Sequence, residues 1–261
     1  GGVEAQVLSD SLNTMIDKIN ELLVQVKTEQ IRLRKAEFEL LQSQINPHFL
    51  YNTLDAIVWL AEAGEQKKVV SMVGSLSDFF RISLNQGQDI LDVKEELQHV
   101  RSYLEIQQMR YQDILQYEIC VPEELNHCQI PKITLQPLVE NAIFHGIEPK
   151  GCAGHIRIHV GYETSDNTEK IRIDVTDDGV GMTADKAAQV LRSNDDSSAD
   201  FFREIGVSNV HKRLQYQFGA EYGITIESKE GEYTTMSIHI PNIPLHNNET
   251  VSSETISSEN T

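Results

Sequence analysis

Apolar residues recur at helical spacing along the first part of the chain. Between residues 8 and 26 they alternate in steps of four and three, which is the heptad pattern of a coiled coil. The positions in this seam are Leu8, Leu12, Met15, Ile19, Leu22 and Val26. The repeat weakens over residues 27 to 35 and the apolar face then resumes, so we predict one long helix from about Ser9 to Ala61. Such a helix has no core of its own. A second copy of the chain is its simplest partner, and packing within the monomer is the alternative.

A second apolar face predicts another helix after Gly64. Its apolar positions are Val69, Met72, Val73, Leu76, Phe79 and Phe80. Gly64 lies in a polar stretch, where a glycine commonly ends a helix. Two helices with so short a connection form an antiparallel hairpin, and hairpins from two chains would form a four-helix bundle. The polar residues 85 to 88 mark the end that we expect for this helical domain.

From Asp89 onward, predicted helices and strands are interleaved. We expect helices over Val93–Tyr111 and Pro131–Gly146. Alternation of apolar and polar residues predicts strands over 115–121, 156–160, 171–175, 224–226 and 236–240. This order predicts a two-layer α/β sandwich whose sheet is covered on one face. The expected fold class is therefore α plus α/β, with a long-helix dimerising hairpin first.

Composition narrows the classes of function. The 261 residues leave room for two domains, and the formal net charge of −18 without a Lys/Arg cluster argues against direct nucleic-acid binding. Cys120, Cys128 and Cys152 form no CxxC pair, which fits a reducing compartment without a disulfide framework or a zinc site. No apolar run approaches the roughly 18 residues of a membrane span, and no signal peptide is evident. We expect the chain as given to be soluble and cytoplasmic.

One histidine in the helical part has an unusual setting. His48 lies in the stretch from Leu41 to Ile57, with Pro47 before it and Asn52 one turn after it. A proline removes a helical hydrogen bond, so we expect the helix to kink or loosen there, and His48 and Asn52 share a face. A single histidine on a helix is usually a packing residue. The second half of the chain changes that assessment.

Two segments of the second half contain parts of a nucleotide site. DVTDDGVGM, residues 174 to 182, leads from a strand into a turn where Gly179 and Gly181 allow close approach of a ligand. Asp177 at the strand end can accept a hydrogen bond from an amine such as that of adenine. The segment VENAIFHG places Asn141 and His145 on one helix face, which suits a hydrated magnesium ion and phosphate oxygens. Each signal alone is weak, since Asp-Gly turns between strands are common.

A third segment, EIGVSNVHKRLQYQFG, adds a possible anion site. Gly206 precedes the amphipathic helix of Val207, Val210 and Leu214, so amides at its positive end would point at an anion. Residues 193–200 before it are polar and aperiodic, as in a mobile flap over a nucleotide or an ordinary surface loop.

QINPHFLYNTL, VENAIFHG, DDGVGM and GVSNVHKRL, in this order and spacing, resemble the sensor histidine kinases of the LytS/YesM type. The resemblance covers roughly Ala36 to Pro241, and VLSDSLNTMIDKINELL resembles the last helix of a HAMP linker. It implies a Bergerat (GHKL) ATP-binding fold and four parts of the chain. These are the end of a HAMP linker or coiled coil (1–26), a dimerisation and phosphotransfer domain (27–88), a catalytic ATP-binding domain (89–242) and a disordered tail (243–261).

The resemblance also implies roles for particular residues. His48 would be the phosphoacceptor, and Asn52 would position a water that dephosphorylates the regulator. Asn141 would be the magnesium ligand and Asp177 the adenine contact. The implied nucleotide-binding set is Asn141, His145, Asp177, Gly179, Gly181, Met182, Gly206, Val207 and Asn209. The implied cofactors are ATP and Mg²⁺, and the implied partners are a second copy and the receiver domain of a response regulator. The chain would be the cytoplasmic part of a membrane protein, attached through a missing N-terminal sensor region.

Three positions depart from patterns found in such kinases. Phe144 stands where a basic residue often meets the phosphates, and Glu204 stands in place of the first glycine of the second glycine box. Phe49 follows the phosphoacceptor, where many other histidine kinases have an acid. Two alternatives therefore remain open. One is an ATPase of the same fold whose turnover ignores His48, and the other is a degenerate kinase that binds ATP as a scaffold.

Overall fold

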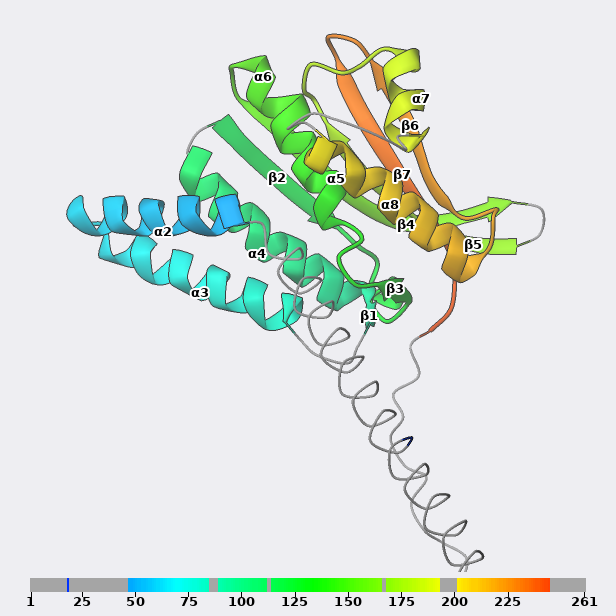
Figure 1. Cartoon of the computed structure of the whole chain (residues 1–261), viewed down its shortest axis with the longest axis horizontal. Coiled ribbons are helices and arrows are strands. Elements are labelled where there is room, and N and C mark those ends of the chain that lie inside the picture. The colour runs from blue at the N-terminus through cyan, green and yellow to red at the C-terminus, as the bar shows by residue number, and fades with distance from the viewer. Residues whose placement is uncertain are drawn as a thin grey trace, which may run out of the picture. The chain divides into compact units, whose positions relative to one another are not determined.

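The computed structural model describes Lys18 and residues 47–84, 89–111, 114–165, 168–192 and 201–244 (Figure 1). The chain divides into two compact units, one ending at Ala56 and the other beginning at Ile57. The predicted heptad seam, the start of the long helix and the expected kink before His48 lie outside the described residues, apart from Lys18, which is helical. The expected flap, residues 193–200, and residues 245–261 of the expected tail also lie outside them.

The helical hairpin is formed by α2 (Pro47–Glu62) and α3 (Gln66–Ser83). Gly64 adopts a φ of 76°, and the Glu65 amide donates to Leu60 O at 2.9 Å while the Gly64 amide donates to Ala61 O at 3.1 Å. These bonds satisfy the last carbonyls of α2, as a glycine at a helix end typically allows. The predicted helix end at Gly64 is confirmed.

Helix α4 (Val93–Tyr111) has the predicted bounds and packs against α3. The Phe79 ring of α3 stacks on His99 of α4 with 4.6 Å between ring centroids, and Ser83 Oγ lies 2.7 Å from His99 Nε2. Ser75 Oγ donates to Glu105 Oε2 at 2.7 Å. Helix α3 therefore packs on α4 within the second of the two compact units.

The main sheet has the strand order β2-β4-β5-β7-β6, in which β2 is parallel to β4 and the other neighbours are antiparallel. All five strands were expected from alternation. Their bounds are β2 Leu115–Cys120, β4 Gly154–Ser165, β5 Thr168–Asp177, β6 Gly223–Lys229 and β7 Tyr233–Pro241. A second, two-stranded sheet of β1 (Ile90–Asp92) and β3 (Gln129–Pro131) was not expected, because three residues are too few to show alternation.

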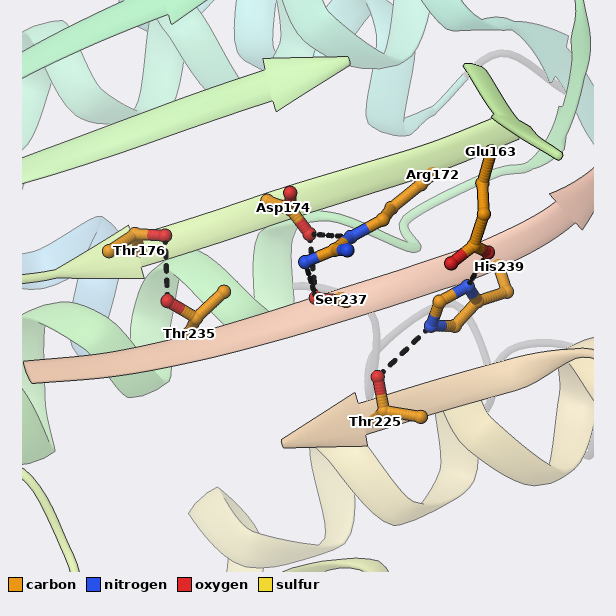
Figure 2. A network of polar contacts seen from close by, with 8 residues as sticks. All are labelled: Glu163, Arg172, Asp174, Thr176, Thr225, Thr235, Ser237 and His239. Carbon is orange, nitrogen blue, oxygen red and sulfur yellow. Dashed lines mark hydrogen bonds and ion pairs between the residues drawn. The ribbon is translucent and has the colours of Figure 1, made fainter. Parts of the chain in front are cut away.

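One face of the main sheet is apolar and the other is polar. Buried residues of the apolar face include Ile156, Ile158, Val160, Ile171, Ile173, Val175, Met236, Ile238 and Ile240. The helices of this domain lie over one side of the sheet (Figure 1). The polar face forms a network across β4, β5, β7 and β6, in which Arg172 Nε and Ser237 Oγ both donate to Asp174 Oδ1 (Figure 2). His239 lies between Glu163 and Thr225 in the same network. The sandwich with one covered face is confirmed.

The second predicted helix of this domain begins later than expected. Pro131 ends β3, and α5 covers Gln136–Asn141. The helix continues as a π-helix, η3 (Ala142–Ile147), and ends as α6 (Glu148–Lys150). The amide of Glu148 donates to Ile143 O, a bond of the wider π spacing. The remaining helices are η2 (Glu123–Leu125), α7 (Ala184–Arg192), which was not predicted, and α8 (Phe201–Phe218).

The end of the described chain differs slightly from the expected start of the tail. The amide of Gln129 donates to Ile243 O at 2.8 Å, and Cys128 forms a β-bridge with Pro244. Ile243 and Pro244 therefore pair with the segment around β3.

Candidate functional site

His48 is exposed on the first turn of the described part of α2. Asn52 Nδ2 lies 3.0 Å from His48 Nε2 and 3.2 Å from His48 Nδ1. The next residue, Phe49, is buried, and its carbonyl accepts a hydrogen bond from Thr53 Oγ1 at 2.7 Å. The helix therefore presents His48 and Asn52 together on one face, as the spacing predicted, while Phe49 and Thr53 are buried.

Asp177 is the buried carboxylate at the end of β5, with 2% of its surface exposed. Its Oδ1 accepts a hydrogen bond from the Gly179 amide at 3.0 Å. A Cβ added at Gly146 would lie 2.3 Å from Asp177 Oδ1, and one added at Gly179 would lie 2.3 Å from the Gly146 carbonyl carbon. Two glycines thus allow the π-helix and the turn to touch beside this carboxylate. The sequence pointed to Gly179 but not to Gly146.

The glycine turn is held on both sides. The Val180 amide donates to Gly146 O at 3.1 Å, which ties the turn to the π-helix. Gly181 has a φ of 63°, and a Cβ there would lie 2.1 Å from Lys229 O in the β6–β7 hairpin. The Met182 amide donates to Ser228 Oγ at 2.8 Å. A larger residue at 179 or 181 would separate the elements that meet here.

The protonation of Asp177 is set by its surroundings. Burial raises the pKa of its carboxyl from 3.8 to about 7, and the neighbouring Asp178 also raises it. The Gly179 amide and Lys150 oppose this shift. Lys150 Nζ is itself 3.1 Å from Asp178 Oδ1. A buried carboxyl with a strongly shifted pKa is typical of a functional site.

Asn141 and His145 lie on the helix that contains Gly146. Asn141 is the last residue of α5 and is 7% exposed, and His145 is the fourth residue of the π-helix. The Gly146–Gly179 contact therefore brings their helix to the Asp177 turn. No three His, Cys, Asp or Glu side chains of the described residues gather into a metal site. A magnesium ion at Asn141 would take its other ligands from phosphate oxygens and water.

The expectation that Gly206 opens a helix is wrong. Helix α8 begins at Phe201, so the unpaired amides of its first turn belong to residues 201–204 and not to Gly206. Gly206 instead permits close packing, because a Cβ there would lie 3.2 Å from Pro137 Cβ of α5. Val207 is fully buried in the core, and Asn209 is exposed. Phe144 is partly exposed, and the side chain of Glu204 lies outside the described part.

Two residues with long-range contacts were missed by sequence reasoning. Glu96 is a fully buried acid of α4, and Arg213 belongs to α8. For Glu96 the signal in the sequence was an acid among the apolar positions of a predicted helix, which is easily taken for a surface residue. Arg213 lies within the motif GVSNVHKRL, but the motif alone assigned it no role. Among the described helices, none is long and apolar enough to cross a membrane.

Comparison with known proteins identifies the family of the two halves. The histidine kinase family matches residues 36–115, and the family described as histidine kinase-, DNA gyrase B-, and HSP90-like ATPase matches residues 131–244. Sensor histidine kinase YesM of Bacillus subtilis is 38% identical over 91% of this chain and 39% of its own length. Sensor histidine kinase BtsS of Escherichia coli K12 is 31% identical over 83% of this chain and 35% of its own.

Among solved structures, the chain is similar to the histidine kinase domain of the blue-light activated histidine kinase of Erythrobacter litoralis EL346. The match covers 78% of this chain and 92% of that structure. Its sequence identity is 13% and its TM-score is 0.44. The chain spans well under half the length of YesM and BtsS. With a histidine kinase segment followed by a nucleotide-binding domain of the ATPase class, the chain belongs to the sensor histidine kinases of the YesM, BtsS and LytS type.

Proposed function

We propose that this chain phosphorylates His48 with ATP and passes the phosphoryl group to an aspartate of a response regulator. The observation that supports this most directly is the exposed imidazole of His48 paired with Asn52, inside a segment that matches the histidine kinase family. In the proposed reaction a His48 ring nitrogen forms a bond to the γ-phosphorus. The bond from the γ-phosphorus to its bridging oxygen breaks, ADP leaves with that electron pair, and the other ring nitrogen loses its proton to water.

The contact with Asn52 suits this chemistry. An amide nitrogen is a donor, and it can donate only to a ring nitrogen that has a free lone pair. Asn52 therefore favours the neutral imidazole, which is the form that can attack phosphorus. Its place beside His48 also supports a role in positioning a water that dephosphorylates the regulator.

The proposed nucleotide site is centred on Asp177. Its carboxylate would accept the adenine amine, and Gly179 and Gly181 would keep the turn open beneath the base. Asn141 would bind Mg²⁺, which would neutralise charge on the phosphates. His145, Met182 and Asn209 complete the proposed set. The fit is supported by the glycines at 146 and 179, since a Cβ at either position would close the space beside the carboxylate.

We further propose that two chains associate through their helical parts. Large apolar side chains are exposed along α2 and α3, among them Tyr51, Leu54, Val58, Trp59, Val70 and Val73. Soluble proteins rarely leave such a set exposed, so a second copy is the expected partner. In this proposal residues 1–26 end a HAMP linker, 27–88 form the dimerisation and phosphotransfer domain and 89–242 the catalytic domain. A missing N-terminal sensor region would attach the chain to the membrane from the cytoplasmic side.

Incubation with γ-labelled ATP and magnesium tests the proposal. We expect acid-labile, base-stable label on the wild type, and none on His48→Ala. His127→Ala is the matched control, because the His127 side chain is 69% exposed and lies in a different part of the chain. Label that persists on His48→Ala would place the phosphoacceptor elsewhere. Release of phosphate without any labelled protein would instead indicate an ATPase.

A further inference from the structure

The segment between β3 and α5 has an unfavourable backbone conformation that other elements hold in place. Ile133 has a φ of 56° and is the single non-glycine residue with positive φ in the described part of the chain. A β-branched residue rarely adopts this conformation. The segment leads directly into α5, the helix that ends at Asn141, so its conformation fixes where α5 starts.

Glu96 of α4 holds this segment from one side. Its Oε1 accepts the amides of Thr134 at 2.7 Å and Leu135 at 2.8 Å, and its Oε2 accepts the amide of Ile133 at 3.0 Å. The carboxylate therefore fixes the three residues that precede α5, the last of them 39 positions later in the chain than Glu96. Burial raises the pKa of Glu96, and the three amides and the charge of Arg213 oppose that shift. A fully buried carboxylate with three donors is a satisfied and specific contact.

Arg213 of α8 holds the same segment from the other side. Its Nη2 donates to Ile133 O and to Thr134 Oγ1, both at 3.0 Å. Thr134 Oγ1 in turn donates to Pro131 O at 2.5 Å. One short segment thus joins α4, α5 and α8 through charged side chains.

Each of the two helices joined in this way carries a residue of the proposed nucleotide site. Helix α5 ends at Asn141, and α8 contains Asn209. Gly206 lies against Pro137 near the start of α5, and Arg213 follows Gly206 by about two turns of the same helix. A small shift of α5 against α8 would therefore change the distance between Asn141 and Asn209 in the proposed site.

We propose that Glu96 and Arg213 are positioning residues that set the nucleotide site by fixing the start of α5 against α8. This inference rests on the proposed ATP site and adds two residues to it. Glu96 lies outside the four motifs, and Arg213 lies near the end of GVSNVHKRL, where no role was assigned to it. Their effect passes through the 131–135 segment, and neither is assigned a contact with the nucleotide.

The test compares variants by titration of ATP with magnesium into the full chain, alongside urea unfolding. Thr134→Val removes the hydroxyl that Arg213 and Pro131 O share, and Thr134→Ser keeps it. We expect Arg213→Ala and Thr134→Val each to weaken ATP binding by about fivefold or more, as loss of one hydrogen bond near 1 kcal/mol does. Thr134→Ser should remain within about twofold of wild type. Arg172→Ala is the matched control, since Arg172 pairs with Asp174 on the polar face of the sheet.

A double variant tests whether Arg213 and Thr134 act together. Because they share the Nη2–Oγ1 contact, Arg213→Ala with Thr134→Val should weaken ATP binding by less than the product of the two single effects. A folded Thr134→Val chain that binds ATP as tightly as wild type would overturn the inference, whatever its unfolding midpoint. In that case the proposed site itself would still stand if the wild type binds ATP and Asn141→Ala loses the magnesium-dependent binding. Wild type that binds no ATP would overturn the proposed function, and this inference with it.

Discussion

The buried carboxyl of Asp177 gives a stability prediction of calculable size. The pKa of an aspartate carboxyl in water is 3.8, whereas that of Asp177 in the folded chain, where the residue is 2% exposed, is about 7. A difference of this size corresponds to about 4 kcal/mol between the two protonation states. This is an upper value, because water entering the site would reduce it. The folded chain without nucleotide therefore tolerates a charged Asp177 poorly.

The sign follows from proton binding in the two states. Between pH 4 and pH 7 the folded chain keeps a proton on Asp177 that the unfolded chain has released, so stability falls as the pH rises through this range. Above pH 7 the full penalty is present, and below pH 4 it is absent. The Asp177→Asn variant has an uncharged amide at this position at any pH, and the amide keeps an oxygen for the Gly179 N–H. The variant should be more stable than wild type at pH 8, by up to about 4 kcal/mol, and nearly equal to it at pH 4.

Thermal unfolding without nucleotide, repeated from pH 4 to pH 8.5, measures this difference. In a domain of this size each kcal/mol moves the midpoint by about 2–4 °C, so the gain at pH 8 is easily resolved. Asp185→Asn is the matched control, since Asp185 is exposed in the first turn of α7 and should show no such gain. ATP should bind the charged carboxylate better, so wild-type affinity should rise with pH through about 7 while the variant binds weakly at every pH. A gain in stability that does not grow with pH would refute the reasoning.

Two further predictions concern the glycine contact and the apolar face of the hairpin. Gly146→Ala should abolish ATP binding in titration and destabilise the chain by about 1–3 kcal/mol, because its Cβ meets Asp177, whereas Gly74→Ala in α3 meets nothing within 4 Å and should leave ATP binding unchanged. A Gly146→Ala chain that binds ATP normally would contradict the proposed cradle. Trp59→Lys should shift the chain toward monomer in sedimentation, because Trp59 is 58% exposed on α2. Tyr216→Lys, which changes an exposed aromatic on α8, should leave the sedimenting mass unchanged. If Trp59→Lys and Tyr216→Lys sediment alike, dimerisation through the hairpin would be contradicted.

Elements with a regular pattern were predicted well. The bounds of α4 are those expected, and all five strands of the main sheet were found, because burial of one face imposes alternation on the sequence. The predicted start of α5 was too early. Pro131 ends a strand that is too short to show a pattern, and the residues before α5 are bound by Glu96 of a distant helix. The start of α8 was also misplaced, because Gly206 is a packing residue inside the helix.

The candidate site was predictable only as far as it is local. Asp177, Gly179 and Gly181 follow one another in a short motif, so their place at one turn could be predicted from neighbouring residues. The contact of Gly146 with Gly179 and the bonds of Arg213 to Ile133 and Thr134 join residues more than thirty positions apart. No single sequence reveals such pairs, because the residue types alone do not say which distant segment they meet.

The π-helix at 142–147 makes the site sensitive to a particular kind of genetic change. A turn with i to i+5 bonds holds one residue more than an α-helical turn. Deleting one residue there would let the helix close with ordinary bonds, so the helix itself would survive. The deletion would rotate Gly146 away from Gly179 and withdraw the carbonyl that accepts the Val180 amide. Loss of one codon would therefore uncouple the helix of Asn141 from the Asp177 turn, the two parts of the proposed nucleotide site. The sheet and the helical hairpin would be left intact, which is a short evolutionary route from a kinase to a scaffold.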